Sequence, residues 1–249
     1  MVTTAEELQE IEKLVLQYPG RLLFSEKYSF SPMAEALLLN KEALGEYLYG
    51  ATFYTNGISN KIMGNGKWRT ECAYNPCAGG LSHNFMVALL FTGSNIKKVR
   101  ASGRVLTHHD NLDAYGGYDF MEGSLEFDNG SILNWIVDLS TNNNNSWFGR
   151  RTVSYFFQFK NGSLTCDPRS GDDIIKIDGK SMDMELESGV GDWENYNNKL
   201  YGKMFKDVLG AIVKNKLPRH NIIQGINVAK ACIFAYNSAK MGGEWIVID

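Results

Sequence analysis

The residues best suited to chemistry lie at the start of one apolar helical segment, residues 79–93. Two glycines open this segment, Ser82, His83 and Asn84 follow in its first turn, and an apolar run then ends at a third glycine. Because a histidine imidazole exchanges protons near neutral pH, His83 could act as a general acid or base. From spacing alone, a histidine that only packs or forms hydrogen bonds at a helix start is slightly favoured, so both interpretations stay open.

Two further histidines, His108 and His109, are followed by Asp110 and could bind a metal. Adjacent residues of a strand point to opposite faces of a sheet, so this pair is poorly arranged for one ion. A metal hydrolase that uses these two residues with His83 is the weakest alternative, since no carboxylate stands at ligand spacing from them. We therefore expect no metal site.

Side chains that could contact a substrate stand in two other segments. Trp68 and Arg69 lie in a polar, glycine-bearing stretch and could provide a stacking surface and a fixed cation. An ordinary loop anchored by Trp68 is equally compatible with that pattern. Lys27 and Tyr28 lie between an expected strand and a helix start, a position that often faces a cleft, although simple surface solvation explains them as well.

Several common chemistries have no motif in the printed sequence. It contains no G-x-G-x-x-G dinucleotide motif, no Walker-type glycine loop and no G-x-S-x-G nucleophile motif. The net charge of −3, with no long run of one sign, argues against a nucleic-acid or membrane-surface protein. No apolar run approaches the roughly 20 residues of a membrane span, and no signal peptide is visible. The four cysteines fit no zinc pattern and indicate reduced thiols, so we expect a cytoplasmic location.

Helical patterns mark both ends of the chain. Thr4 and Glu7 form a capping box at the start of a first amphipathic helix, which Pro19-Gly20 ends. Ser31-Pro32 suits the start of a second helix. Apolar residues at helical spacing predict further helices over residues 85–91, 193–212 and 222–236.

The alternating patterns in the middle of the chain predict one large sheet. Strands are expected over residues 22–24, 45–55, 99–106, 121–127, 132–139, 153–159, 164–166, 174–177 and 245–248. Turn signals at residues 128–130, 161–162 and 178–179 join consecutive strands and therefore make them antiparallel. The fold class is thus α+β, with a large, predominantly antiparallel sheet and helices packed on one face. The other face, rich in Tyr155, Phe157 and Trp135, is expected to pair with a second copy in a homo-oligomer.

Four segments of the chain carry a resemblance to a known family. They are SEKYSFSP at residues 25–32, ALGE at 43–46 before a tyrosine-rich strand, the glycine-opened helix with His83, and the closing helix and strand over residues 225–247. Their order and spacing resemble the C-terminal part of the glucose–fructose oxidoreductase / inositol dehydrogenase (Gfo/Idh/MocA) family, over nearly all of the 249 residues.

The resemblance implies a second domain outside this sequence. Members of the family bind NAD(P) in an N-terminal Rossmann domain, whose Glu-Lys-Pro motif supplies a catalytic lysine. Residues 1–20 then correspond to a remnant helix of that preceding dinucleotide-binding domain, and residues 21–249 to the C-terminal sheet domain. We therefore expect the chain alone to bind no cofactor and to be inactive. The complete enzyme would use NAD(P), with a separate Rossmann-domain partner as one way to supply it.

The resemblance also implies roles for individual residues. His83 corresponds to the family's active-site histidine. Contacts to the substrate are expected from Lys27, Tyr28, Trp68, Arg69 and Asn84. Where the family has an aspartate, one turn before the histidine, this chain has Gly79, so the proton relay of that carboxylate is missing there.

The predicted function is the substrate-binding and oligomerisation half of an NAD(P)-dependent sugar or polyol oxidoreductase. The alternative is a cofactor-free carbohydrate-binding or scaffold module that acts through its sheet face. Neither prediction includes a metal, nucleic acid or a membrane as a partner.

Overall fold

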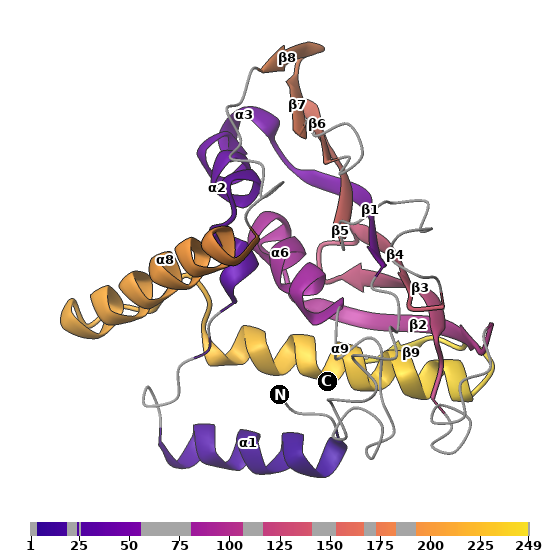
Figure 1. Cartoon of the computed structure of the whole chain (residues 1–249). Coiled ribbons are helices and arrows are strands. Elements are labelled where there is room, and N and C mark those ends of the chain that lie inside the picture. Colours follow the sequence, from indigo (N-terminus) through magenta and orange to yellow (C-terminus); the bar gives the residue numbers. More distant parts are fainter. Residues whose placement is uncertain are drawn as a thin grey trace.

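A nine-stranded sheet dominates the computed structural model of the chain, which describes residues 4–18, 24, 26–55, 81–106, 117–140, 153–166, 173–182 and 193–248 (Figure 1). The strands are β1 (Tyr47–Thr55), β2 (Ile96–Arg104), β3 (Phe120–Phe127), β4 (Ile132–Asp138), β5 (Val153–Phe159), β6 (Gly162–Cys166), β7 (Asp173–Ile177), β8 (Lys180–Met182) and β9 (Ile246–Val247). Their order across the sheet is β8-β7-β6-β5-β1-β4-β3-β2-β9.

Short turns explain three of the eight strand pairs described in the sheet. The β3–β4, β5–β6 and β7–β8 pairs are antiparallel hairpins at the three expected turn signals. At the last of them Asp178 and Gly179 both have positive φ, 49° and 76°, which suits a tight two-residue turn. The one parallel pair joins β1 to β4 and was not predicted, because those strands are far apart in the sequence and no turn signal links them. The predominantly antiparallel α+β fold is confirmed.

The helices are α1 (Ala5–Gln17), the 3₁₀ helix η1 (Lys27–Phe30), α2 (Pro32–Leu39), α3 (Lys41–Leu44), α6 (Ser82–Thr92), α8 (Trp193–Val213) and α9 (Ile222–Lys240). The predicted capping box of Thr4 with Glu7 begins α1. Ser31 caps α2 with Pro32 in its first turn, and Gly93 ends α6 in the left-handed conformation. Of the short strand expected at residues 22–24, only Phe24 is described, and it is not in a strand.

The helices form layers on one side of the sheet (Figure 1). α6 lies nearest the middle of the sheet, where Phe85 contacts Trp135 and Phe91 contacts Phe157 with ring centroids 5.8 and 5.7 Å apart. α9 packs along β2, and α1 lies on α9 through Leu8. The prediction of helices on one face is therefore confirmed.

The prediction of the residues on the open face of the sheet was wrong. Tyr155, Phe157 and Trp135 are buried at 6%, 0% and 1% exposure, on the face that α6 covers. The sequence interpretation placed these aromatic positions on the open face. The helix-covered face carries the largest aromatic side chains, so the two faces of each strand were exchanged. The other face carries Tyr49, Ala51 and Phe53 of β1, Asn134 and Ile136 of β4, and Phe156 of β5.

Gly123 of β3 is required for close packing under the helices. A Cβ atom there would overlap the carbonyl oxygen of Arg100 and lie 2.5 Å from Cζ2 of Trp135. We expect Gly123→Ala to lower the free energy of unfolding by about 1–3 kcal/mol, the usual cost of overpacking. Urea denaturation of the wild type and the variant measures this difference in free energy.

The matched control is Gly202→Ala in α8, where an added Cβ meets nothing within 4 Å. Alanine is the better helix former, so this variant should gain about 0.5–1 kcal/mol. Equal stability of the two variants would contradict the close packing at Gly123.

Candidate active site

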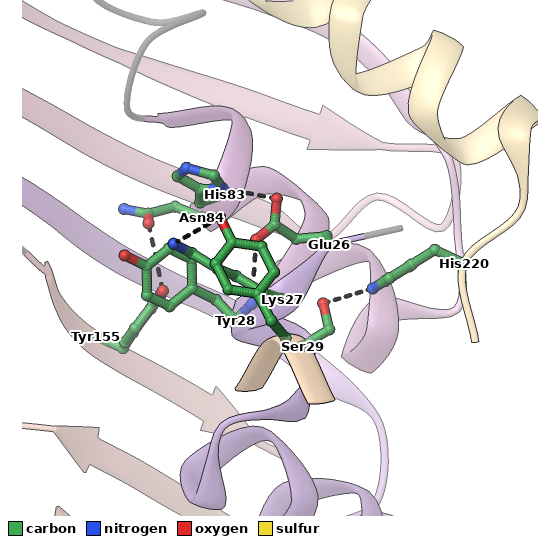
Figure 2. Close-up of polar contacts among 9 residues, drawn as sticks. Glu26, Lys27, Tyr28, Ser29, His83, Asn84, Tyr155 and His220 are labelled. Carbon is green, nitrogen blue, oxygen red and sulfur yellow. Dashed lines mark hydrogen bonds and ion pairs between the residues drawn. The ribbon is translucent and has the colours of Figure 1, made fainter. Parts of the chain in front are cut away.

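His83 lies in the first turn of α6, where that helix meets η1 (Figure 2). Its Nδ1 atom is 2.6 Å from Oε2 of Glu26, the residue immediately before η1. The His83 side chain is 26% exposed and the Glu26 side chain only 8%. The contact therefore joins a nearly buried carboxylate to a ring that still reaches the surface.

Glu26 is held by both of its carboxylate oxygens. Oε1 caps η1 by accepting the backbone N–H of Tyr28 at 3.1 Å, while Oε2 faces His83. Burial by itself would raise the pKa of Glu26, but the hydrogen bond and charge of His83, with the Tyr28 amide, hold that pKa below its ordinary value. Glu26 is therefore an anion at neutral pH, and its Oε2 faces Nδ1 of His83.

Lys27 and Tyr28, both expected to contact a substrate, lie beside His83. The Tyr28 ring meets the His83 ring edge-on, with centroids 4.9 Å apart. Nζ of Lys27 lies 5.1 Å from the centre of the Tyr28 ring and 4.7 Å from that of Tyr201 in α8, and it donates to the Tyr201 hydroxyl at 3.5 Å. Burial, with the nearby phenols of Tyr54, Tyr196 and Tyr201, raises the pKa of Tyr28, so its hydroxyl stays protonated. The site is thus rich in tyrosine.

Asn84 is fully buried beneath the site, at 0% exposure. Its Nδ2 donates to Oγ1 of Thr52 at 2.6 Å, and its Oδ1 accepts from the Tyr155 hydroxyl at 3.3 Å (Figure 2). The Thr52 hydroxyl in turn donates to the backbone oxygen of Ser154. These bonds fix α6 on β1 and β5, and the expectation that Asn84 touches substrate is corrected: its amide has no exposed surface.

A second buried histidine supports η1 from behind. Nε2 of His220 and Oγ of Ser29 are 2.5 Å apart, and both residues are at most 1% exposed. The neighbouring Arg219 donates from Nη1 to the backbone oxygen of Ser29. Burial lowers the pKa of His220 to about 4, although the charge of Glu26 opposes this, so His220 is neutral at pH 7.

Other predicted site residues lie outside the described part of the chain. They are Trp68, Arg69, Gly79, His108 and His109. Within the described ranges, no cluster of three or more histidine, cysteine, aspartate or glutamate residues could hold a metal ion. None of the described helices combines the length and apolar character needed to cross a membrane.

Comparison with known proteins gives a match in structure only. No protein-family profile matches the chain, and no curated protein is significantly similar to it in sequence. An aldose–aldose oxidoreductase from Caulobacter crescentus, complexed with glycerol, superposes with a TM-score of 0.72 at 17% identity, over 100% of this chain and 70% of its own. A myo-inositol 2-dehydrogenase from Lactobacillus plantarum gives 0.70 at 15% identity, over 99% and 71%. A UDP-N-acetylglucosamine 3-dehydrogenase from Acidithiobacillus ferrooxidans gives 0.68 at 14% identity, over 96% and 68%.

The chain has the fold of the Gfo/Idh/MocA-type oxidoreductases. The resemblance drawn from the sequence is thereby confirmed for the fold, along essentially the whole chain. About 30% of the length of the Caulobacter neighbour has no counterpart in these 249 residues, since 70% of it is matched.

Two residues that surround His83 were missed from the sequence. Glu26 was quoted only as part of a motif, and Tyr201 only as part of the helix that carries it. The only signal for Glu26 was an acidic residue directly before Lys27-Tyr28. Nothing in the spacing linked it to His83, which stands 57 residues further along.

Two buried ionisable groups, Glu26 and His220, should make the folded chain less stable in acid. The folded pKa of His220, about 4, lies below its ordinary value of 6.5, so the unfolded chain binds that proton more readily. The resulting stability is complete above pH 6.5 and is lost as the pH falls toward 4, by roughly 3 kcal/mol. Glu26, with a lowered pKa, contributes stability above pH 4.5 that is lost below it.

The measurement is the free energy of unfolding in urea at pH 7.5, 6.0 and 4.5, for the wild type and His220→Gln. The variant should lose less stability than the wild type between pH 7.5 and 4.5, whatever its stability at pH 7.5. Parallel curves for the two proteins would show that His220 is not the group responsible.

Proposed function

We propose that this chain is the substrate-binding part of an NAD(P)-dependent sugar or polyol oxidoreductase of the Gfo/Idh/MocA type. The observation that carries the proposal is the partly exposed His83 at the start of α6, within a fold shared with such enzymes along the whole chain. The names of the three neighbours refer to an aldose, to myo-inositol and to UDP-N-acetylglucosamine, all polyhydroxylated compounds. A proton-handling ring beside tyrosine hydroxyls and a lysine suits a compound of this class.

In the proposed mechanism His83 handles the proton of a substrate hydroxyl. With Nδ1 directed at Glu26, the Nε2 atom is left to accept that proton in oxidation and to return it in reduction. Lys27 and the hydroxyl of Tyr201 are placed to donate hydrogen bonds to neighbouring oxygens. The Tyr28 and Tyr201 rings offer apolar faces to the C–H surface of a sugar. Trp68 and Arg69 stay in the proposal as further contacts.

A nicotinamide cofactor would supply the acceptor for the hydride that leaves the substrate carbon. The described residues do not fit such a cofactor: their sheet has a single parallel pair, β1 with β4, and the printed sequence has no G-x-G-x-x-G motif. NAD(P) would therefore be held by residues outside this sequence. On this proposal residues 1–20 belong with that cofactor domain and residues 21–249 form the substrate domain.

Calorimetric titration with a panel of polyols and sugars, including myo-inositol, glycerol and glucose, tests the proposal on the chain itself. We expect at least one compound to bind without NADH. His83→Gln should raise its Kd roughly tenfold, about 1.4 kcal/mol, for the loss of one hydrogen bond. Lys27→Met should also weaken binding.

Lys13→Met is the matched control, since Lys13 is an exposed lysine of α1 paired with Glu10. It should bind like the wild type. Binding that survives both His83→Gln and Lys27→Met would place the ligand elsewhere and favour the alternative of a carbohydrate-binding or scaffold module.

We propose further that a second copy covers the open face of the sheet. The described helices all lie on the opposite side (Figure 1). The open face has apolar side chains at its centre and a shallow hollow of about 420 Å³ beside Phe53 and Ile136. A broad face of this kind supports self-association, which is also the surface that the scaffold alternative would use.

Light scattering at micromolar concentration tests the self-association. The wild type should be a dimer or larger, and Ile136→Lys, on the open face, should shift it to monomer. Leu39→Lys is the control, because Leu39 is 86% exposed on α2, away from the sheet. A monomeric wild type would contradict the proposal.

A further inference from the structure

A carboxylate faces His83 from a segment that is remote in the sequence. Glu26 precedes η1 and His83 begins α6, so the contact at 2.6 Å joins two elements rather than two turns of one helix. The carboxylate expected from the family resemblance would stand one turn before His83, where this chain has Gly79. Glu26 approaches from outside α6 and reaches the same ring.

The other charged groups described around η1 have partners of their own. The Glu35 carboxylate is paired with Lys203 at 2.7 Å, and the Asp207 carboxylate accepts the backbone N–H of Arg219 at 2.7 Å. Lys27 is directed at the Tyr28 and Tyr201 rings. Among the described residues, the only carboxylate that bonds to the His83 ring is that of Glu26.

We infer that Glu26 is the positioning residue of His83: it holds the proton of the neutral ring on Nδ1 and so leaves the lone pair of Nε2 for the substrate hydroxyl. This inference rests on the proposed function for the role of Nε2, but the position of the proton is a property of the chain alone. An anion beside Nδ1 also stabilises the imidazolium that forms when Nε2 takes a proton.

The surroundings of Glu26 make this arrangement rigid. Its second oxygen is committed to the Tyr28 amide, so the carboxylate cannot rotate away without uncapping η1. Ser29 of the same short helix is bonded by Arg219 and His220, both from the segment just before α9. The edge of the Tyr28 ring packs on the imidazole itself. Glu26 is thus fixed from two sides, as a group that orients another must be.

The test locates the ring proton by NMR in the chain labelled with ¹⁵N-histidine. Of the four imidazoles, His83 is identified by the signals that are missing in His83→Gln. At a pH where the ring is neutral, we expect a protonated Nδ1 with a strongly deshielded proton, and an unprotonated Nε2. A neutral His83 ring with its proton on Nε2 would overturn the inference.

Variants separate orientation from simple packing. Glu26→Gln keeps the shape but can either donate to or accept from Nδ1, so the fixed preference and the deshielded proton should be lost. Glu35→Gln, which also removes one ion-paired carboxylate, should leave both unchanged. A deshielded Nδ1 proton that persists in Glu26→Gln would contradict the assignment. If Glu26→Gln does not fold, the wild-type ring pattern still decides.

Polyol titration distinguishes this inference from the proposed function. Introduced alone, Glu26→Gln should weaken polyol binding. Introduced together with His83→Gln, it should weaken binding no further, because Glu26 acts only through the His83 ring. A proton on Nδ1 with no polyol bound would overturn the proposed function and leave the positioning role. Polyol binding together with a ring proton on Nε2 would support the proposed function and overturn the positioning role.

Discussion

The burial of α6 is the constraint on which the rest of the structure depends. Nearly every side chain of this helix is enclosed, with the sheet on one side and α9, α2 and η1 around it. A helix that is apolar all round can exist only in such a position. Its ends are then the only places where it can carry polar groups. The start of α6 holds Ser82 and His83 at partial exposure, so the only reactive ring of this helix stands where the core meets the surface.

Two polar side chains under that helix start, Asn84 and Glu26, are hydrogen-bonded within the protein, because an unbonded buried group would cost about 1–3 kcal/mol. One set of bonds joins Asn84 to Thr52 and Tyr155. A second set joins Glu26 to His83 and to the Tyr28 amide. The two sets differ in one respect. The Asn84 set lies wholly inside and leaves nothing to a ligand, whereas the Glu26 set ends in a ring with an open edge. Of these bonded groups, only the ring of His83 offers an exposed edge to a ligand.

Local signals predicted those parts of the fold that depend on neighbouring residues. The capping box at Thr4, the Ser31 cap and the turns at 128–130 and 178–179 are all formed as expected, because each is decided within a few residues. The parallel β1–β4 pair and the side on which Trp135 and Phe157 lie depend on the helical layer, which no strand pattern contains. For the site, the fold brings His83, Lys27 and Tyr28 together, and their roles stay a prediction. Asn84 was misjudged, since a polar residue beside a histidine can equally well point into the core.

The contact of Glu26 with His83 follows from what a histidine requires. An imidazole that must present one nitrogen to a substrate needs an acceptor at the other, and the sequence position of that acceptor does not matter. The sequence resemblance implies an aspartate at the position of Gly79, so a search by spacing finds no acceptor for His83 there. The fold supplies it from a segment 57 residues earlier, at 2.6 Å. The role proposed for His83 therefore depends on the geometry between η1 and α6, not on the spacing of residues along the chain.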